Sequence, residues 1–507
     1  MAVNRNIFTY TPESRGRAAL LFLLFLLAIY EFISAGFNAF AIVCLIPIFV
    51  LYVIATFRWK MFTFWLLMGV NYFVQWKNFP SIGLPTSALN ELLEIVLIAL
   101  AIIDVKEAKF ERTANIMLVM LLSWAAFCTL EVFNDSCNLG IQVGAWYTGA
   151  RMMAFQLLYA FFVYILYITT PKRLIKYLVV WGSLSLFASF WVWKQKNIGF
   201  TDAENSWLQT VGYRTHIING GTLIRYFSVF NDAATFGINM AATAVAFLIF
   251  GITNKIKKIK YFCLIAGAAS FWATFPSGTR TSIFCFFAGI MLYIVLSKSV
   301  KIATSVSIAF VLFVFMLAFT DIGNGNQQIR RMRSAFNKDD ASANVRDINK
   351  AEIKKYLVDA PWGIGVGIGY DNVPANNKYR RLSTIPPDSE YVFIWVHTGI
   401  IGITFFLITT AIMLITACWT VFFKIKSPTL RGIGSGLCCA FIAIQLGGYA
   451  NQVLMQFPNC LLFYGGLSLV FALPHFEDEW NEYEKEQLAI QAEKERIKLE
   501  KKRAKRV

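Results

Sequence analysis

Three arginines and one aspartate are the strongest candidates for chemistry in this chain, because each lies next to a long apolar segment or in a polar connection between two such segments. Arg225 and Asp388 each precede an apolar segment, Arg280 ends the short turn Pro276–Arg280, and Arg346 lies in a long polar connection. A guanidinium group binds phosphate through paired hydrogen bonds, and a carboxylate can accept a proton. These residue types predict binding of a phosphate-bearing ligand beside a general base. The alternative for each arginine is an anchor at the membrane interface or a salt bridge to an acid of a connection.

Two residues that closely follow Asp388 are further candidates for the site. Glu390 is a reserve base, and Tyr391 is a candidate substrate-binding residue. The alternative for the two acids is a structural one, in which they pair with nearby basic residues of the same connection. Those basic residues are Lys378, Arg380 and Arg381.

A glycine-rich stretch precedes these acids. Residues 361–369 place Gly363, Gly365 and Gly367 at alternate positions. Successive backbone N–H groups of such a stretch can approach an anion closely, so we predict that these glycines bind substrate. A flexible return loop is the alternative, because the motif is short.

The remaining ionisable residues near apolar segments are weaker candidates. His216 and His397 are titratable, and structural hydrogen bonding is the simpler interpretation for both. Glu91 and Glu94 lie three residues apart and share a helix face, where they can bond across the bundle or line a substrate groove. No HExxH motif occurs and no acidic cluster has clear ligand spacing, so no metal and no other cofactor is expected.

The composition identifies the class of protein. Of the 507 residues, 57% are hydrophobic and 15% are charged, against about 25% charged in soluble domains. The net charge of +17 does not indicate nucleic-acid binding, because Lys and Arg concentrate in short connections between apolar segments, where they set membrane topology. The sequence therefore predicts an all-α polytopic membrane protein with about fourteen spans, each needing about 20 apolar residues.

The basic residues also predict the orientation. With the N-terminus in the cytoplasm, every short cytoplasmic connection is basic, whereas the short outside connections carry only Lys77, Arg151 and Arg280. Two long connections then lie outside, at about 194–231 and 321–390. The second is too long for a simple connector and is expected to be functional, with a helix at about 343–358.

This orientation gives a provisional domain organisation. Seven spans occupy residues 1–193, an outside loop follows at 194–231, and residues 232–473 form the catalytic membrane region, which includes the loop 321–390 between spans eleven and twelve. Residues 474–507 are expected to form a charged cytoplasmic helix.

These motifs resemble those of the O-antigen ligase and O-antigen polymerase superfamily of bacterial inner-membrane glycosyltransferases, over about 225–402. Residues 277–280 resemble the family's Ser-Gly-Ser-Arg turn, and Arg346 followed by residues 361–367 resembles its Arg and Pro-x-x-Gly-x-Gly order. Residues 388–402 resemble its His-Asn-x-Tyr…Glu-x-Gly-x-x-Gly segment. One departure is clear: Asp388 stands where ligases usually carry His.

The resemblance implies a bundle like that of GT-C glycosyltransferases, in the inner membrane, with its site facing the periplasm. It implies a glycan donor carried on undecaprenyl diphosphate, an acceptor that is lipid A–core or a growing glycan, and inversion without a metal. Arg225, Arg280 and Arg346 would then stabilise the leaving diphosphate and Asp388 would be the base. Ligation and polymerisation both remain open, as does the alternative of a transporter or lipid-oligosaccharide flippase. Membrane lipids are the other expected partners, and nucleic acid is not expected.

Overall fold

The computed structural model describes residues 12–35, 37–79, 86–105, 108–218, 223–325, 327–333 and 341–504. Over these residues the chain is almost entirely helical, and one two-stranded antiparallel sheet pairs β1 (Ile217–Ile218) with β2 (Leu223–Ile224). The chain forms two compact units, Met1–Leu66 and Leu67–Val507. The predicted all-α membrane class is confirmed at this level.

The first unit contains α1 (Pro12–Ala35), α2 (Phe37–Arg58) and the start of α3 (Phe62–Phe73). Helices α1 and α2 pack against each other. Near the start of α3, the Thr56 and Thr63 side-chain oxygens lie 2.9 Å apart.

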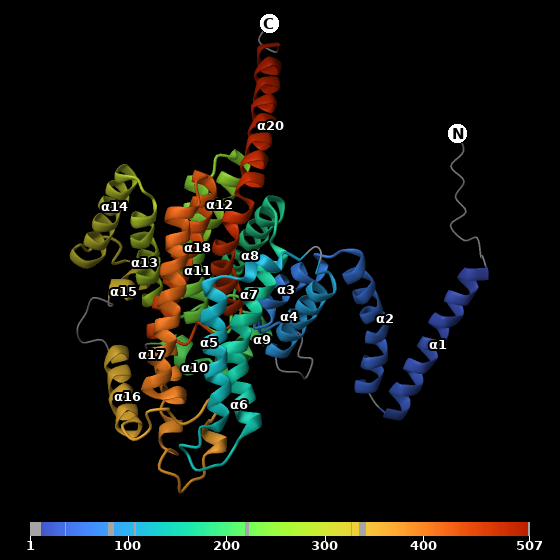
Figure 1. The fold of residues 1–507 in the computed structure, drawn as a ribbon. Coiled ribbons are helices and arrows are strands. Elements are labelled where there is room, and N and C mark those ends of the chain that lie inside the picture. Colours follow the sequence, from blue (N-terminus) through green and yellow to red (C-terminus); the bar gives the residue numbers. More distant parts are fainter. Residues whose placement is uncertain are drawn as a thin grey trace. The chain divides into compact units, whose positions relative to one another are not determined.

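The second unit begins within α3 and continues with helices of very different lengths (Figure 1). Its first half contains α4 (Thr86–Ile103), η1 (Phe110–Thr113), α5 (Ile116–Leu130), η2 (Glu131–Phe133), α6 (Val143–Ala150), the π-helix η3 (Arg151–Phe155), α7 (Gln156–Tyr167), α8 (Pro171–Asn197), α9 (Asp202–Thr210), α10 (Tyr213–His216), α11 (Ala233–Thr253) and α12 (Lys257–Thr274). Its second half contains α13 (Arg280–Leu296), α14 (Val300–Phe319), α15 (Gln327–Arg333), α16 (Ala341–Leu357), η5 (Tyr370–Asn372), η6 (Leu382–Thr384), α17 (Glu390–Trp419), the π-helix η7 (Thr420–Lys424), α18 (Pro428–Ala450), the π-helix η8 (Cys460–Tyr464), α19 (Gly465–Ala472), η9 (Leu473–Phe476) and α20 (Glu477–Ala504).

Seven helical stretches of the described chain are long and apolar enough to cross a membrane. They are Ile116–Phe133, Val143–Tyr167, Pro171–Asn197, Ala233–Thr253, Glu390–Lys424, Pro428–Ala450 and Cys460–Ala504. Shorter apolar helices also occur, among them Arg280–Leu296. A multi-pass membrane protein is thereby supported, while the figure of fourteen spans stays a prediction.

The core is built around α11, which packs against α12, α13 and α18. Its N-terminus is fixed by Asp232, whose Oδ1 accepts hydrogen bonds from the N–H groups of Ala234 at 2.7 Å and Thr235 at 2.9 Å. Such a cap satisfies helix N–H groups that have no partner within the helix. The cap fixes where α11 begins, directly after the segment that carries Arg225.

Helix α17 is broken near its start, which the sequence did not predict. Gly399 has φ +66 and ψ −170, and a Cβ atom there would lie 1.9 Å from the Pro361 carbonyl oxygen. A continuous apolar helix of this length would have to tilt or extend beyond the bilayer. The break instead divides it into a short first part, Glu390 to Thr398, and a longer second part.

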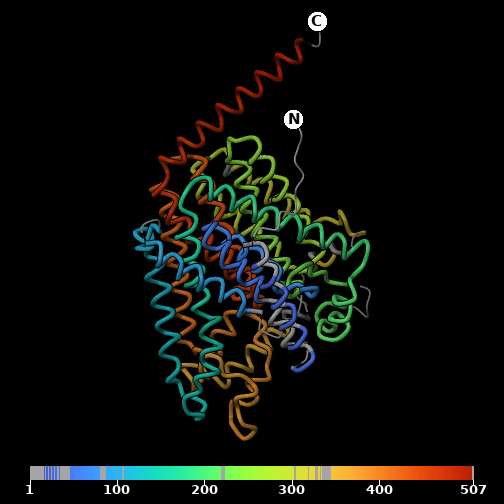
Figure 2. Tube along the Cα trace, turned by 90° about the vertical axis from the view of Figure 1, so that its right-hand side faces the viewer, coloured from blue at the N-terminus to red at the C-terminus, as the bar shows by residue number. Residues whose placement is uncertain are grey.

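The connection after α15 contains the predicted loop helix, which is α16 and agrees with the expected bounds within two residues. Residues 326 and 334–340 of this connection lie outside the described chain. Both views place the segment 358–389 beside residues 131–143, at the opposite end of the second unit from α20 (Figures 1 and 2). The C-terminal segment is helical as predicted.

Candidate functional site

The turn Pro276–Arg280 and the segment after β2 form one structural unit. The Tyr226 N–H donates to the Pro276 carbonyl at 3.2 Å. Arg225 donates from Nε to the Ser277 carbonyl at 3.3 Å and from Nη2 to the Thr279 hydroxyl at 2.9 Å. Two segments that are 50 residues apart in the sequence are therefore joined through the guanidinium group of Arg225.

Gly278 makes the close approach at this turn possible. Its φ is +57, a conformation that favours glycine. A Cβ atom at this position would lie 3.3 Å from side-chain atoms of both Arg225 and Arg331. The Gly278 carbonyl accepts a hydrogen bond of 2.6 Å from Arg331 Nε, so two arginines flank the glycine.

Four positive charges gather around this turn. Burial and the charges of Arg331, Arg346 and Arg280 lower the pKa of Arg225 to about 10, while the carboxylate of Asp232 opposes the shift. Like charges held together in a partly buried place favour binding of an anion, which relieves their repulsion. The three arginines predicted from the sequence are thus brought together, with Arg331 as a fourth.

Arg346 also connects this charge cluster with Asp388. Both line a cleft with a volume of about 530 Å³. The other polar residues that line it are Asp347, Lys350, Ser389 and Tyr391, and the apolar ones are Pro387, Val392, Trp395, Ile400, Ile403, Tyr449 and Ala450. One cavity therefore combines charged groups with an apolar wall from α17.

Asp388 is held in an unusual conformation at this cleft. Its φ is +54, which costs a non-glycine residue of the order of 1–3 kcal/mol. Asn349 of α16 donates to its Oδ2 at 2.8 Å, and the hydroxyl of the next residue, Ser389, donates to the Gly448 carbonyl at 3.0 Å. The carboxylate is therefore held by α16, and the residue that follows it is held by the end of α18.

Glu390 and Tyr391 have different surroundings. Glu390 is 3% exposed, and its Oε2 accepts a hydrogen bond of 2.9 Å from the Leu454 N–H, so this carboxylate is buried away from the cleft. Tyr391 lines the cleft, and its hydroxyl donates to the Gln445 carbonyl at 2.9 Å. Of the two predicted acids, Asp388 thus faces the cavity, whereas Glu390 holds the segment after α18.

The basic residues that were alternative partners for these acids make other contacts. Lys378 pairs with Asp359 at 3.4 Å, and Arg381 lies 3.6 Å from Glu352. Arg380 donates to backbone carbonyls and lies 3.4 Å from the Tyr370 ring centroid. The structural interpretation of Asp388 and Glu390 as their ion-pair partners is therefore not the arrangement found.

The predicted substrate-binding glycines are not among the residues that line the cleft, and two of them pack against helices. A Cβ atom at Gly363 would lie 2.5 Å from the backbone of Gly399, and one at Gly367 would lie 1.8 Å from the Ala145 carbonyl of α6. The Ile364 and Gly365 N–H groups donate to the carbonyls of Val396 and His397, at 2.9 and 3.1 Å. These bonds engage carbonyls next to the break in α17.

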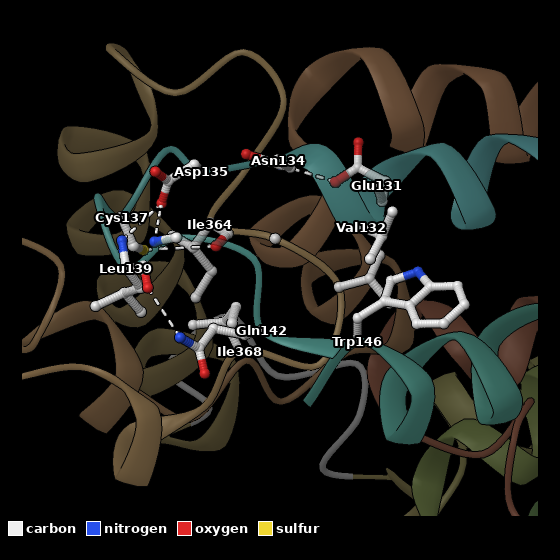
Figure 3. A pocket seen from close by; sticks show the side chains of 13 residues that line it. Glu131, Val132, Asn134, Asp135, Cys137, Leu139, Gln142, Trp146, Ile364 and Ile368 are labelled. Carbon is white, nitrogen blue, oxygen red and sulfur yellow. Dashed lines mark hydrogen bonds between the residues drawn. The ribbon is translucent and has the colours of Figure 1, made fainter. Parts of the chain in front are cut away.

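Figure 3 shows the other side of this stretch, where it meets residues 131–146. Asn134 donates to Glu131 at 2.7 Å and to the Trp362 carbonyl at 2.8 Å, and the Cys137 thiol lies 3.5 Å from the Ile364 carbonyl. The pocket there has a volume of about 10 Å³, which holds at most one water. Gly363 and Gly367 therefore allow tight packing, and their predicted role in substrate binding stays a prediction.

His216 lies beside the arginine cluster as a neutral residue. Its Nε2 accepts a hydrogen bond of 3.0 Å from the Ala233 N–H, so Nδ1 carries the proton and bonds to the Gly212 carbonyl or the Thr215 hydroxyl. Burial and the nearby charge of Arg225 lower the pKa of His216 to about 4. Its contacts are structural, as expected, and the same is true of His397, whose Nδ1 bonds to the Gly365 carbonyl at 3.0 Å.

Comparison with known families identifies the segment that contains most of this site. Residues 265–407 match the family model described as O-antigen ligase. This stretch belongs to the O-antigen ligase superfamily. The match includes Arg280, Arg346 and Asp388 and begins after Arg225, so the predicted resemblance is confirmed. No curated protein matches the chain.

Sequence reasoning missed Arg331. It lies in the run Arg330-Arg331-Met332-Arg333, where three arginines of α15 are indistinguishable by type and spacing. Arg330 and Arg333 both bond to Asn324, whereas Arg331 alone of the three bonds to Gly278. The run of arginines in a long connection was a usable signal, but only the fold selects one of them.

Proposed function

We propose that this protein transfers a glycan from undecaprenyl diphosphate to a hydroxyl group of an acceptor sugar, at the periplasmic face of the bacterial inner membrane. The observation that carries the proposal is the gathering of four guanidinium groups around the turn Pro276–Arg280, next to a cleft that contains Asp388. The match of residues 265–407 to the O-antigen ligase family supports a glycan-transferring role.

The reaction requires a base at one end and positive charge at the other. The acceptor hydroxyl oxygen attacks the anomeric carbon, and Asp388 takes the hydroxyl proton. A new carbon–oxygen bond forms while the bond from that carbon to the diphosphate oxygen breaks, with inversion. The electron pair leaves with the lipid diphosphate, and the arginines stabilise the charge that develops there.

The arginines suit this role because Arg225 is held rigidly before substrate arrives. Its three hydrogen bonds, to Thr215, Ser277 and Thr279, fix its position. Preorganised donors cost little reorganisation during the reaction. We propose that they provide the charge stabilisation and that no metal is needed for it.

The membrane arrangement belongs to the same proposal. About fourteen spans in a bundle like that of GT-C glycosyltransferases would place α16 and the cleft outside and α12 inside at its start. Cysteines introduced at Asn344 and at Lys257 test this orientation: an impermeant thiol reagent applied from the periplasm should label the first and not the second. The reverse labelling would contradict the proposal that the cleft faces the periplasm.

A transfer assay tests the chemistry. Purified wild-type protein with a lipid-linked glycan donor and an acceptor should release the lipid diphosphate, and Arg280→Ala and Arg346→Ala should lose transfer while inserting normally. Wild-type rates in both variants would contradict the role of the arginine cluster. Electrophoresis of surface glycans from a gene-deletion strain distinguishes the two reactions: loss of all capped lipid A–core indicates ligation, and retention of one repeat unit indicates polymerisation.

A further inference from the structure

A second group of buried polar residues lies on α4, separate from the arginine cluster. Asn90 and Glu94 are both 0% exposed, and their spacing of four residues places them on one face of the helix. Both carboxylate oxygens of Glu94 and both amide atoms of Asn90 lack a hydrogen bond to any residue that the structure describes. Buried polar atoms are normally paired, so this face of α4 requires an explanation.

The facing helix contributes another side chain of the same kind. Helix α4 packs against α7, which begins with Gln156. Gln156 is 3% exposed, and neither of its side-chain amide atoms bonds within the described chain. It follows Arg151 by one turn of the π-helix η3, and π-helical turns occur often at functional sites.

The position of Arg151 fixes the register between the two elements. Arg151 pairs with Glu91 at 3.2 Å and donates to the Ser87 hydroxyl at 2.8 Å. Helices α4 and α7 continue in the same direction from these contacts, because the Tyr167 hydroxyl bonds to the Leu97 carbonyl and Tyr159 interacts electrostatically with both Glu91 and Glu94. Gln156 precedes Tyr159 by about one helical turn, so we expect it to face the part of α4 that carries Asn90 and Glu94. The charge of Glu91 is balanced by Arg151, whereas no basic side chain of the described residues pairs with Glu94.

Glu94 has one acidic neighbour on α4, Glu91, and its other electrostatic neighbours are weakly polar. Its carboxyl group interacts with the Tyr159 and Tyr164 hydroxyls of α7 and with the Cys460 thiol of η8. Glu94 lies eight residues after the start of α4, which corresponds to about 12 Å along the helix. An ionised carboxylate that is fully buried without a hydrogen-bond partner is energetically expensive, and in membrane helices such residues commonly bind an ion or a proton.

We propose that Glu94, together with the side-chain oxygens of Asn90 and Gln156, forms a binding site for a monovalent cation, either Na⁺ or a proton. Carboxylate and amide oxygens are the ligands that hard cations prefer. A single uncompensated carboxylate matches a single positive charge, because Arg151 already neutralises Glu91. This site is independent of the glycan-transfer proposal.

Glu94→Gln is the decisive variant, because glutamine keeps the shape of the side chain and removes its charge. In purified full-length protein, the first measurement is thermal unfolding with Na⁺ replaced by choline at constant ionic strength. If Na⁺ is the ligand, the wild-type Tm rises with Na⁺ and the Glu94→Gln Tm does not. The second measurement is infrared difference spectroscopy over pH, in which a carboxyl band that titrates in wild type and is absent from Glu94→Gln identifies the proton.

Two further variants separate a site from a structural role. Asn90→Leu should weaken the Na⁺ response, or shift the midpoint of the carboxyl band, by about tenfold in cation concentration, which is the size of one lost contact. Glu131→Gln is the matched control, since Glu131 is also buried but bonds to Asn134. It should keep the wild-type response. Identical Na⁺ and pH behaviour of wild type and Glu94→Gln in both measurements would overturn the proposal.

Discussion

The role of Arg331 can be tested most sharply, because α15 provides its own control. A hydrogen bond to a charged group contributes about 1.5–3 kcal/mol. If Arg331 contacts the departing diphosphate, Arg331→Ala should lower kcat/KM for the lipid-linked donor roughly 10- to 150-fold. Arg330→Ala removes a guanidinium from the same helix that bonds to the Asn324 carbonyl and should keep transfer near the wild-type rate.

The charge on Arg331 gives a second readout that a structural role would not affect. Its positive charge contributes to lowering the pKa of Arg225 to about 10. In the wild type, activity should therefore fall as the pH approaches 10 and Arg225 loses its proton. In Arg331→Ala the pKa of Arg225 rises, so this decline should move to higher pH.

The assay is the rate of release of the lipid diphosphate, measured from neutral to alkaline pH. Arg331→Lys should recover part of the activity, since it restores the charge but not the paired donors of a guanidinium. Equal kcat/KM for Arg331→Ala and Arg330→Ala, with the same alkaline decline as the wild type, would refute the reasoning.

Three further predictions concern other residues of the site and its support. Asp388→Asn should abolish glycan transfer and Asp388→His should keep some of it in the same assay, whereas an active Asn variant would exclude a base role. Gly399→Ala should lower the free energy of unfolding by at least about 1–3 kcal/mol, since its φ is +66 and the Pro361 carbonyl lies 1.9 Å from the new Cβ; Gly144→Ala, with open space around it, is the control for thermal unfolding. His216 has a pKa of about 4 in the fold against 6.5 when free, so the unfolded chain binds its proton first as the pH falls. The free energy of unfolding should therefore decrease by about 3 kcal/mol between pH 6.5 and 4, and the Tm should fall with it. His216→Asn should reduce this decrease, and the same dependence of Tm on pH in that variant as in the wild type would contradict the prediction.

The helical elements were predictable because hydrophobic periodicity and length determine them. Helix α16 is an example, since its bounds agree with the expected 343–358 within two residues. The break at Gly399 was not predictable in the same way. An apolar run does not reveal a bend that depends on a glycine stretch about 30 residues earlier, whose N–H groups bond to the carbonyls beside the break.

The candidate site also has parts that the sequence predicts and parts that depend on the fold. Residue type and position next to apolar segments identified Arg225, Arg280, Arg346 and Asp388, and the fold brings these together. Type alone could not distinguish Arg331 from its neighbours in α15. Nor could it show that Gly363 and Gly367 serve helix packing, because that depends on contacts with α17 and α6.

The divided helix α17 has a consequence for how this architecture can diversify. Its short first part carries cleft residues such as Val392 and Trp395, and its carbonyls at Val396 and His397 are bonded to the loop at Ile364 and Gly365. The orientation of the cleft wall is thus set by this loop as well as by α18, to which Ser389 and Tyr391 bond. Altered loop sequences could therefore reshape the cleft while the contacts between α11, α13 and α18 stay intact, and under the proposed function such changes would alter which acceptor sugar fits.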